Sequence, residues 1–361
     1  MTKEGSQNVE TMVKKFILII TLLLTASFGQ SDAKPHGGTS EGKLLGFSHI
    51  TTNNSGLSYD GVRCMLRDSR GYVWIGTQKG LSRYDGARFR VFDRQDFHVD
   101  SDYVNSLCED CRGNILIGTD RGVVLYDHES DAIHPLDGLS CRVYTMCATG
   151  GSLIYLGVKS EGLYVYDADD GAIKSLELVN PDGELLRDIY RIAIGKDNIM
   201  YMAAYCDNLY RISLKDMQAT AMVSTIPHME DMFEKDDIEG LAVNPKNSNL
   251  LYVLSQENGL VEVNNMTSCA KVLMELPENV FPTVLQYFEG TLWVTTSRGL
   301  YEYDVVTGDH VCYTSDADDR YSLSDDYTTC LMCSDGGKSI WVGTSGGGIN
   351  VYSSASANDG L

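Results

Sequence analysis

One pattern recurs seven times along the chain. An apolar strand is followed by a polar turn with glycine, a strand around an aromatic residue, a short glycine turn and a strand that often ends in Tyr-Asp. The aromatic position, where leucine stands in once, marks the copies at Trp74, Leu116, Tyr155, Tyr201, Tyr252, Trp293 and Trp341. Intervals of 39 to 51 residues fit a four-stranded propeller blade and are too long for a leucine-rich repeat. We therefore predict an all-β fold, a seven-bladed β-propeller with four-stranded antiparallel blades.

The aromatic and glycine positions of the pattern have mechanical interpretations. A large flat side chain on the second strand would fill the wedge between neighbouring blades, so we interpret Trp74, Trp293 and Trp341 as architectural. Glycines before the third strand, such as Gly80 and Gly299, suit hairpin turns that need a positive φ.

The seventh copy lacks an outer strand, because only the small and polar residues 353–361 follow Tyr352. A spare strand lies at the other end of the repeat region, in residues 44–51 around Phe47. We predict that residues 44–51 join the last blade beside residues 348–352. This pairing would close the ring and leave no unpaired sheet edge.

The N-terminus has the pattern of a secretory signal peptide. Lys14 and Lys15 precede the apolar run of residues 16–24, and small and polar residues follow as far as Ala33. The run is too short to cross about 30 Å of hydrocarbon comfortably. The true start could be Met12, and the alternative is an uncleaved anchor. No other segment approaches 18 apolar residues, so we expect a periplasmic protein with no membrane span in the mature chain.

The predicted organisation follows from these features. Residues 1–33 are a signal peptide and leader, residues 34–43 a linker, residues 44–352 the propeller and residues 353–361 a polar tail. The formal charge of the chain is −21 at pH 7. Its field repels phosphate backbones and sulfated or uronic polymers, so nucleic acid is not an expected partner.

The ten cysteines would suggest disulfides in an exported protein. The repeat register instead favours free thiols that occupy the inward strand position of Leu66, namely Cys108, Cys147 and Cys333. Cys108 with Cys111, and Cys330 with Cys333, have the C-x-x-C spacing found in zinc and redox sites. No histidine lies at ligand spacing beside either pair. We predict no metal and no cofactor.

Two acidic segments resemble calcium loops. In residues 167–171 the third carboxylate comes one residue early and no glutamate closes the loop, so we expect a hairpin turn. The aspartates between residues 316 and 326 are interpreted as a solvated loop, with calcium binding as the alternative. No nucleophile motif is present, and we predict that the chain is not an enzyme. A glycan-cleaving propeller with paired carboxylates from different blades is the enzymatic alternative.

The first copy resembles the two-component regulator propeller repeat. The matching residues are Asp68, Gly71, Trp74, Ile75, Gly76, Thr77, Gly80, Leu81, Tyr84 and Asp85. The fourth and fifth copies depart from the pattern, because they lack Gly-Thr. The resemblance implies the periplasmic sensor region of a hybrid histidine kinase that detects oligosaccharides. It implies an oligosaccharide ligand, with a homodimer or a downstream kinase module as further partners.

No kinase motif follows Tyr352, so the chain is expected to be a truncated sensor, a fragment or a stand-alone relative. The competing function is a stand-alone exported propeller that acts as a protein-interaction scaffold.

A ligand is expected where the loops entering each first strand meet the turns between the second and third strands. Aromatic faces and charged groups there suit sugar rings and their hydroxyls. The first class of loop supplies Tyr59, Tyr103, Arg142, Arg187, Asp237, Phe281 and Tyr327. The second class supplies Lys79, Arg121, Lys159, Tyr205 and Arg298.

Overall fold

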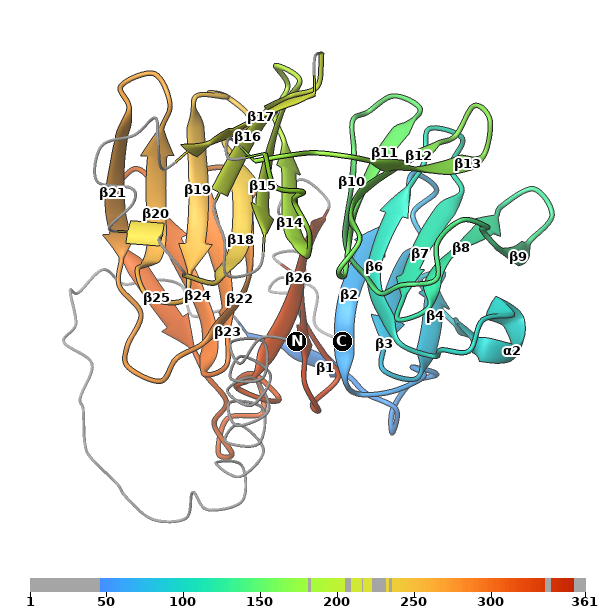
Figure 1. Cartoon of the computed structure of the whole chain (residues 1–361). Coiled ribbons are helices and arrows are strands. Elements are labelled where there is room, and N and C mark those ends of the chain that lie inside the picture. Colours follow the sequence, from blue (N-terminus) through green and yellow to red (C-terminus); the bar gives the residue numbers. More distant parts are fainter. Residues whose placement is uncertain are drawn as a thin grey trace, which may run out of the picture. The chain divides into compact units, whose positions relative to one another are not determined.

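The computed structural model describes residues 46–180, 183–204, 209–215, 217–222, 232–233, 236–334 and 339–353. These residues form seven four-stranded sheets in which every pair of neighbouring strands is antiparallel. The sheets stand side by side as blades (Figure 1). The predicted seven-bladed propeller is confirmed.

The blades are numbered here in chain order, and each is given from its innermost to its outermost strand. Blade 1 consists of β2 (Val62–Arg67), β3 (Val73–Thr77), β4 (Gly80–Tyr84) and β5 (Phe89–Phe92). Blade 2 consists of β6 (Val104–Glu109), β7 (Ile115–Thr119), β8 (Gly122–Asp127) and β9 (Ala132–Pro135). Blade 3 consists of β10 (Val143–Ala148), β11 (Leu153–Val158), β12 (Gly162–Asp167) and β13 (Ala172–Leu176). Blade 4 consists of β14 (Ile189–Ile194), β15 (Ile199–Ala204), β16 (Leu209–Ser213) and β17 (Gln218–Ala221).

The remaining blades follow the same plan. Blade 5 consists of β18 (Ile238–Val243), β19 (Leu250–Ser255), β20 (Gly259–Asn264) and β21 (Cys269–Met274). Blade 6 consists of β22 (Pro282–Phe288), β23 (Thr291–Thr296), β24 (Gly299–Asp304) and β25 (His310–Tyr313). Blade 7 consists of β26 (Thr328–Ser334), β27 (Ser339–Thr344), β28 (Ile349–Ser353) and β1 (Ser48–Ile50). A short helix, α2 (Arg94–Phe97), lies between blades 1 and 2 in the chain.

The N-terminal strand closes the ring as predicted. β1 pairs with β28, and Ser48, His49 and Ile50 lie opposite Val351, Asn350 and Ile349. The observed strand is shorter than the predicted segment 44–51, whose first two residues lie outside the described part. The innermost strand of each blade contacts that of the next, and β26 contacts β2. The leader, linker and tail predictions concern residues that the structure does not describe, apart from Ser353 at the end of β28.

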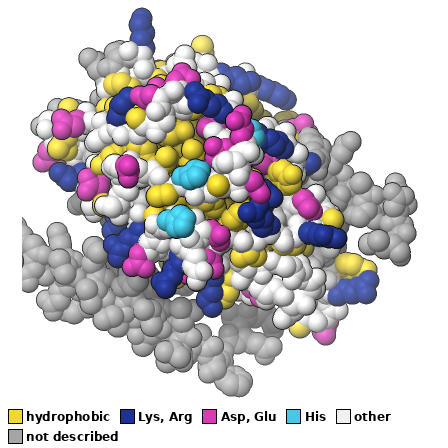
Figure 2. Space-filling view, turned by 90° about the vertical axis from the view of Figure 1, so that its right-hand side faces the viewer, with side chains coloured by type: hydrophobic (Ala, Val, Ile, Leu, Met, Phe, Trp, Pro, Cys, Tyr) yellow, Lys and Arg dark blue, Asp and Glu magenta, His cyan; other side chains and the backbone are white. Residues whose placement is uncertain are grey.

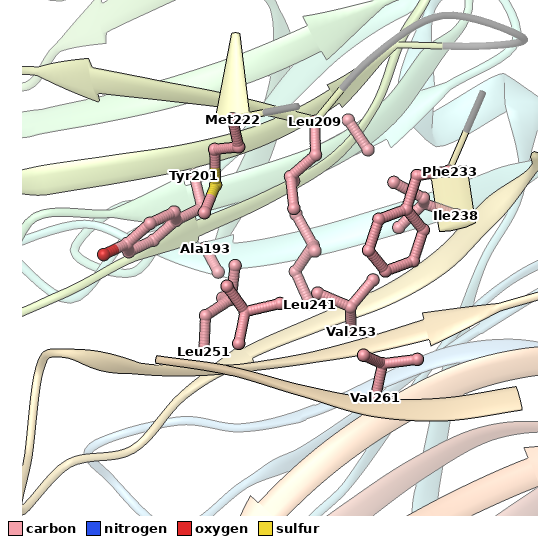
Figure 3. Close-up of a cluster of buried hydrophobic side chains, with 12 residues drawn as sticks. Ala193, Tyr201, Leu209, Met222, Phe233, Ile238, Leu241, Leu251, Val253 and Val261 are labelled. Carbon is pink, nitrogen blue, oxygen red and sulfur yellow. The ribbon is translucent and has the colours of Figure 1, made fainter. Parts of the chain in front are cut away.

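The core lies between the blades, because each blade presents an apolar face to its neighbour. Between blades 4 and 5, Tyr201, Leu209, Leu251 and Val253 form one buried cluster with Phe233 (Figure 3). Such a cluster is repeated at each junction, and it supplies the apolar burial that holds a repeat protein together.

Trp74 is architectural, in agreement with its interpretation from the sequence. It is fully buried between blades 1 and 2, and its ring centroid lies 4.7 Å from that of Tyr126. Trp293 is buried in the junction between blades 6 and 7, and Trp341 is half-buried in the junction between blades 7 and 1.

The nine described cysteines are free thiols. Cys108 and Cys147 lie opposite the marker residues of their blades, as Leu66 lies opposite Trp74. The assignment of Cys333 to this position is wrong, because Met332 lies opposite Trp341 and Cys333 lies opposite Ile340. Both Leu331 and Met332 are buried, so strict alternation cannot set the register of β26. Burial raises the pKa of the Cys108 thiol to about 12, which keeps it protonated.

Residues 167–171 form a hairpin turn between β12 and β13, as expected. The Gly171 amide donates to the Asp167 carbonyl at 2.8 Å, and the Asp167 carboxylate accepts from the Asp169 amide at 3.0 Å. Asp170 pairs with Lys174 at 2.7 Å. The carboxylate of Asp167 therefore closes the turn, and that of Asp169 lies 3.6 Å from the guanidinium of Arg112 on the neighbouring blade.

Candidate functional site

Two classes of loop meet at one end of the ring, which we call the loop face. Turns between second and third strands donate backbone hydrogen bonds to the loops entering the innermost strand of the same blade. These bonds join Lys159 to Arg142, Gln256 to Asp237, Ser297 to Phe281, and Ser345 to Tyr327, at 2.8 to 3.0 Å. The juxtaposition predicted from the repeat is thus present in the fold.

Neighbouring blades are also joined at the loop face. The amide of the turn glycine donates to a carbonyl in the loop that enters the next blade. Gly80 donates to Asp102 at 2.9 Å, and Gly348 donates to Asp60 at 3.0 Å across the closure of the ring. These bonds give the loops fixed positions relative to one another.

Eleven of the twelve predicted residues lie on this face, and Tyr205 lies outside the described residues. Three aromatic side chains are exposed, Tyr103 by 40%, Phe281 by 51% and Tyr327 by 44%. The half-buried members are Tyr59, Arg142 and Asp237, and the exposed cations are Lys79, Arg121, Lys159, Arg187 and Arg298.

The structure brings some of these residues into contact. The Lys79 ammonium lies 4.4 Å from the centre of the Tyr59 ring. The Arg187 guanidinium donates to the Ser160 carbonyl at 2.9 Å. Phe281 and Tyr327 contribute their main-chain carbonyls to the turns and leave their rings exposed. The face therefore combines exposed rings with cations whose positions are only partly fixed.

Arg142 forms an ion pair that sequence analysis did not foresee. Its Nε lies 2.8 Å from Oδ1 of Asp120, which follows the second strand of blade 2. Asn105 donates to the same carboxylate at 2.8 Å. Burial favours the protonated acid, but the hydrogen bonds from Arg142 and Asn105 outweigh it and lower the pKa of Asp120.

Every innermost strand contains a β-bulge at the same place. The register shifts by one residue directly after the first residue of each of these seven strands. The residue before each bulge is buried, whereas the bulged residue is half-buried or exposed. A bulge redirects one side chain, and here the redirected side chain of each innermost strand is less buried than the residue before it. We call these seven residues the axial ring: Arg63, Asn105, Tyr144, Tyr190, Glu239, Thr283 and Thr329.

Sequence reasoning missed the axial ring. The only available signal was the chemical variety at the second residue of otherwise similar strands. Arg191, which follows one ring residue, pairs with the Glu239 carboxylate at 2.8 Å and donates to the Thr283 carbonyl at 3.1 Å. Burial raises the pKa of Glu239 even though Arg191 opposes the shift.

Two hollows lie away from the predicted residues. One, of about 260 Å³, lies between blades 1 and 2 and is lined by Arg83, Tyr126 and Asp131 among others. The other, of about 600 Å³, lies where β1 meets blade 1 and is lined by His49, Tyr84 and Phe89 among others. Basic and acidic side chains are interspersed on the side of the molecule that carries α2 and β9 (Figure 2).

Within the described residues, no group of histidine, cysteine and acidic side chains could hold a metal ion. No helix in the same part of the chain is long and apolar enough to cross a membrane.

In blade 1, strand β3 with Trp74 and the turn before it with Gly71 carry the repeat pattern described above. Residues 56–79 match the family of two component regulator propellers. This confirms the recognition made from the first repeat. No curated protein matches the chain.

Solved structures share the fold. The extracellular domain of the hybrid two component system BT4673 from B. thetaiotaomicron has a TM-score of 0.71 and 23% identity, over 85% of this chain and 39% of that one. The corresponding domain of BT3049 from the same organism has a TM-score of 0.69 and 18% identity, over 86% of this chain and 42% of that one. This chain thus spans about two fifths of the length of these neighbours. A chain of the mitotic checkpoint complex has a TM-score of 0.63 and 12% identity, over 91% of this chain and 96% of that one.

Proposed function

We propose that this chain is an exported ligand-sensing propeller of a two-component regulatory system. It binds an oligosaccharide at the loop face and catalyses no reaction. The matched repeat and the extracellular neighbours support the sensor assignment. The fold alone does not, because the same architecture occurs in the mitotic checkpoint complex.

One observation carries the choice of ligand. Tyr103, Phe281 and Tyr327, from three blades, expose their rings on the same face, although aromatic rings are usually withdrawn from water. Sugar rings stack their apolar faces on such side chains, and their hydroxyls bond to charged groups. Lys79, Arg121 and Arg298 provide cations at the neighbouring turns.

The test is binding to a panel of neutral and acidic oligosaccharides, followed by calorimetry on each ligand found. Tyr103→Ala, Phe281→Ala and Tyr327→Ala are each expected to weaken binding by about tenfold. Tyr321→Ala is the matched control, because Tyr321 is 51% exposed but lies in the loop that packs beside β1. If no member of the panel binds, the oligosaccharide assignment is wrong. If binding occurs and all three variants match the parent, the loop face is the wrong location.

The absence of catalysis has its own test. The chain is incubated with every oligosaccharide that it binds, and new reducing ends are measured. None are expected beyond those produced without protein. A release of reducing ends that survives repurification would contradict this part of the proposal.

A further inference from the structure

The axial ring divides into a fixed half and an open half. On blades 4 to 7 the ring residues are held by their neighbours. The Thr283 hydroxyl donates to the Thr328 carbonyl at 2.9 Å, and the Thr329 hydroxyl donates to the Val62 carbonyl at 2.6 Å. Arg191 holds Glu239 and lies over the Tyr190 ring, 4.6 Å from its centre. This half of the ring has its polar groups engaged.

The ring residues of blades 1 to 3 keep unused hydrogen-bonding groups. Arg63 is exposed and forms no ion pair with any described residue, and its guanidinium carbon lies 5.9 Å from the centre of the Tyr103 ring. The Asn105 side-chain amide donates a hydrogen bond from Nδ2 to the Asp120 carboxylate, but its Oδ1 is buried without a partner in the described structure. The Tyr144 hydroxyl likewise has no partner within the described residues, while its ring lies 4.8 Å from that of Tyr190.

These side chains face one space. Arg63, Asn105 and Tyr144 occupy the same bulge position on β2, β6 and β10, and β6 contacts both of the other two innermost strands. The tilted pair of Tyr144 and Tyr190 joins blades 3 and 4. Because Arg63 on an innermost strand is exposed, this space is open to solvent.

The unused groups have the chemistry of a sugar site. A guanidinium offers several donors, an amide oxygen accepts, a phenol can do either, and an aromatic ring offers an apolar surface. The unpaired Asn105 oxygen is costly while buried, so a hydroxyl that reaches it gains more than an ordinary hydrogen bond. The carboxylates of Asp120 and Glu239 beside the ring are each paired with an arginine, and the formal charge of −21 of the whole chain disfavours an anionic ligand.

We propose that Arg63, Asn105 and Tyr144 form an axial subsite for the terminal residue of a neutral oligosaccharide, which inserts end-on along the propeller axis. The proposal rests on the proposed function, and it names the part of the face that selects the ligand. The exposed aromatic rings of the loop face then bind the remaining sugar residues of the oligosaccharide.

The probes are the neutral monosaccharides glucose, galactose, mannose, xylose and arabinose, with glucuronate as the acidic comparison. Saturation-transfer NMR detects weak binding, and calorimetry measures any oligosaccharide that the panel identifies. Tyr144→Phe removes one hydroxyl and keeps the ring, so we expect about threefold to tenfold weaker binding. Arg63→Gln is expected to weaken binding by about tenfold or more. Lys174→Ala is the control, because Lys174 lies on the outermost strand of blade 3.

The outcomes separate the two proposals. If an oligosaccharide binds but Tyr144→Phe and Arg63→Gln bind it like the parent, the axial subsite is wrong and the sensor assignment stands. Stronger binding of glucuronate than of glucose would overturn the neutral assignment. If neither panel binds, both proposals fail. Loss of binding in both axial variants, with the control unchanged, supports the subsite.

Discussion

A buried carboxylate explains why the repeat carries an aspartate six residues before its tryptophan. Asp68 accepts hydrogen bonds from the Tyr72 amide and the Trp74 indole, both at 2.8 Å, and from the Arg70 amide at 3.0 Å. It therefore closes the turn between two strands and fixes the ring that fills the junction of two blades. Asn244 occupies a similar turn in blade 5, where it accepts from the Lys246 amide and donates to the Tyr252 hydroxyl.

Asp68→Ala is expected to lower the free energy of unfolding by about 3 kcal/mol, because it leaves several donors unpaired around a buried indole. Denaturation in urea measures the change. Asp137→Ala, at an exposed aspartate, is the control and is expected to have little effect. Equal stability of the two variants would show that the Asp68 hydrogen bonds contribute nothing net.

Asp131 joins blades 1 and 2 through charge. It accepts from the Tyr126 hydroxyl at 2.7 Å and pairs with Arg83 and Arg90. The Tyr126 hydrogen bond, with the two arginines, lowers the pKa of Asp131 to about 2. Since the pKa is about 3.9 in the unfolded chain, the carboxylate stabilises the fold above pH 4, and this contribution is lost as the pH falls through 2.

Asp131→Asn should therefore cost at most about 1 kcal/mol at neutral pH, because the side chain is half exposed and screened by solvent. The difference between variant and parent is expected to shrink between pH 4 and pH 2. Chemical denaturation across this range measures it. A difference that stays constant with pH would mean that the charge of Asp131 is not the stabilising feature.

At the scale of elements, the turn between the second and third strands of blade 1 requires a glycine for two reasons. Gly80 has φ of +94°, and a Cβ there would lie 2.5 Å from the Phe92 carbonyl oxygen. The Thr77 hydroxyl donates to the Gly80 carbonyl at 2.9 Å, which closes the turn. The same bond joins Thr344 to Gly348. The Gly-Thr and Gly-Leu pairs of the family pattern are thus parts of one turn.

Gly80→Ala and Gly71→Ala form a matched pair. Gly71 has a similar φ of +92°, but a Cβ there would meet no atom within 4 Å. We expect Gly71→Ala to cost about 1 kcal/mol from backbone strain alone, and Gly80→Ala to cost about 1–3 kcal/mol more from the clash. Denaturation midpoints of the two variants compare them directly. If the two losses are equal, the close approach of Phe92 is unimportant.

The blades could be predicted from the sequence because their markers are local. Trp74 and Gly80 each impose a geometry that any copy of the repeat must meet. The register of β26 could not be predicted, because both faces of that strand are apolar. The bulge before Cys64 could not be predicted either, since it depends on packing between blades rather than on a local preference. The loop face followed from topology, but the pairing of Arg142 with Asp120 needed the fold.

At the scale of the whole molecule, three residues from one end of the chain complete the sheet at the other end. Phe47 lies just before β1 and is buried against Tyr313, with ring centroids 6.1 Å apart. His49 contacts the Ser322 carbonyl at 2.8 Å. The N-terminal segment therefore covers the edge of β28 and fills part of the core between blades 6 and 7.

A chain that begins at Thr52 is expected to lose about 3–5 kcal/mol of stability, because it lacks Phe47 and Ile50 from the core. It is also expected to self-associate through the uncovered edge of β28. A chain that begins at Gly46 is the control. Denaturation and light scattering test both effects. A shortened chain that stays monomeric and equally stable would show that β1 is dispensable.

The seven bulges separate two tasks that most strands combine. A side chain on an ordinary innermost strand would have to suit the neighbouring blade, whereas the bulged Arg63, Asn105 and Tyr144 form no hydrogen bond to another blade within the described residues and can be exchanged with little effect on the faces that hold the blades together. New selectivity could therefore be engineered by single-codon changes at these three positions, with the scaffold left intact.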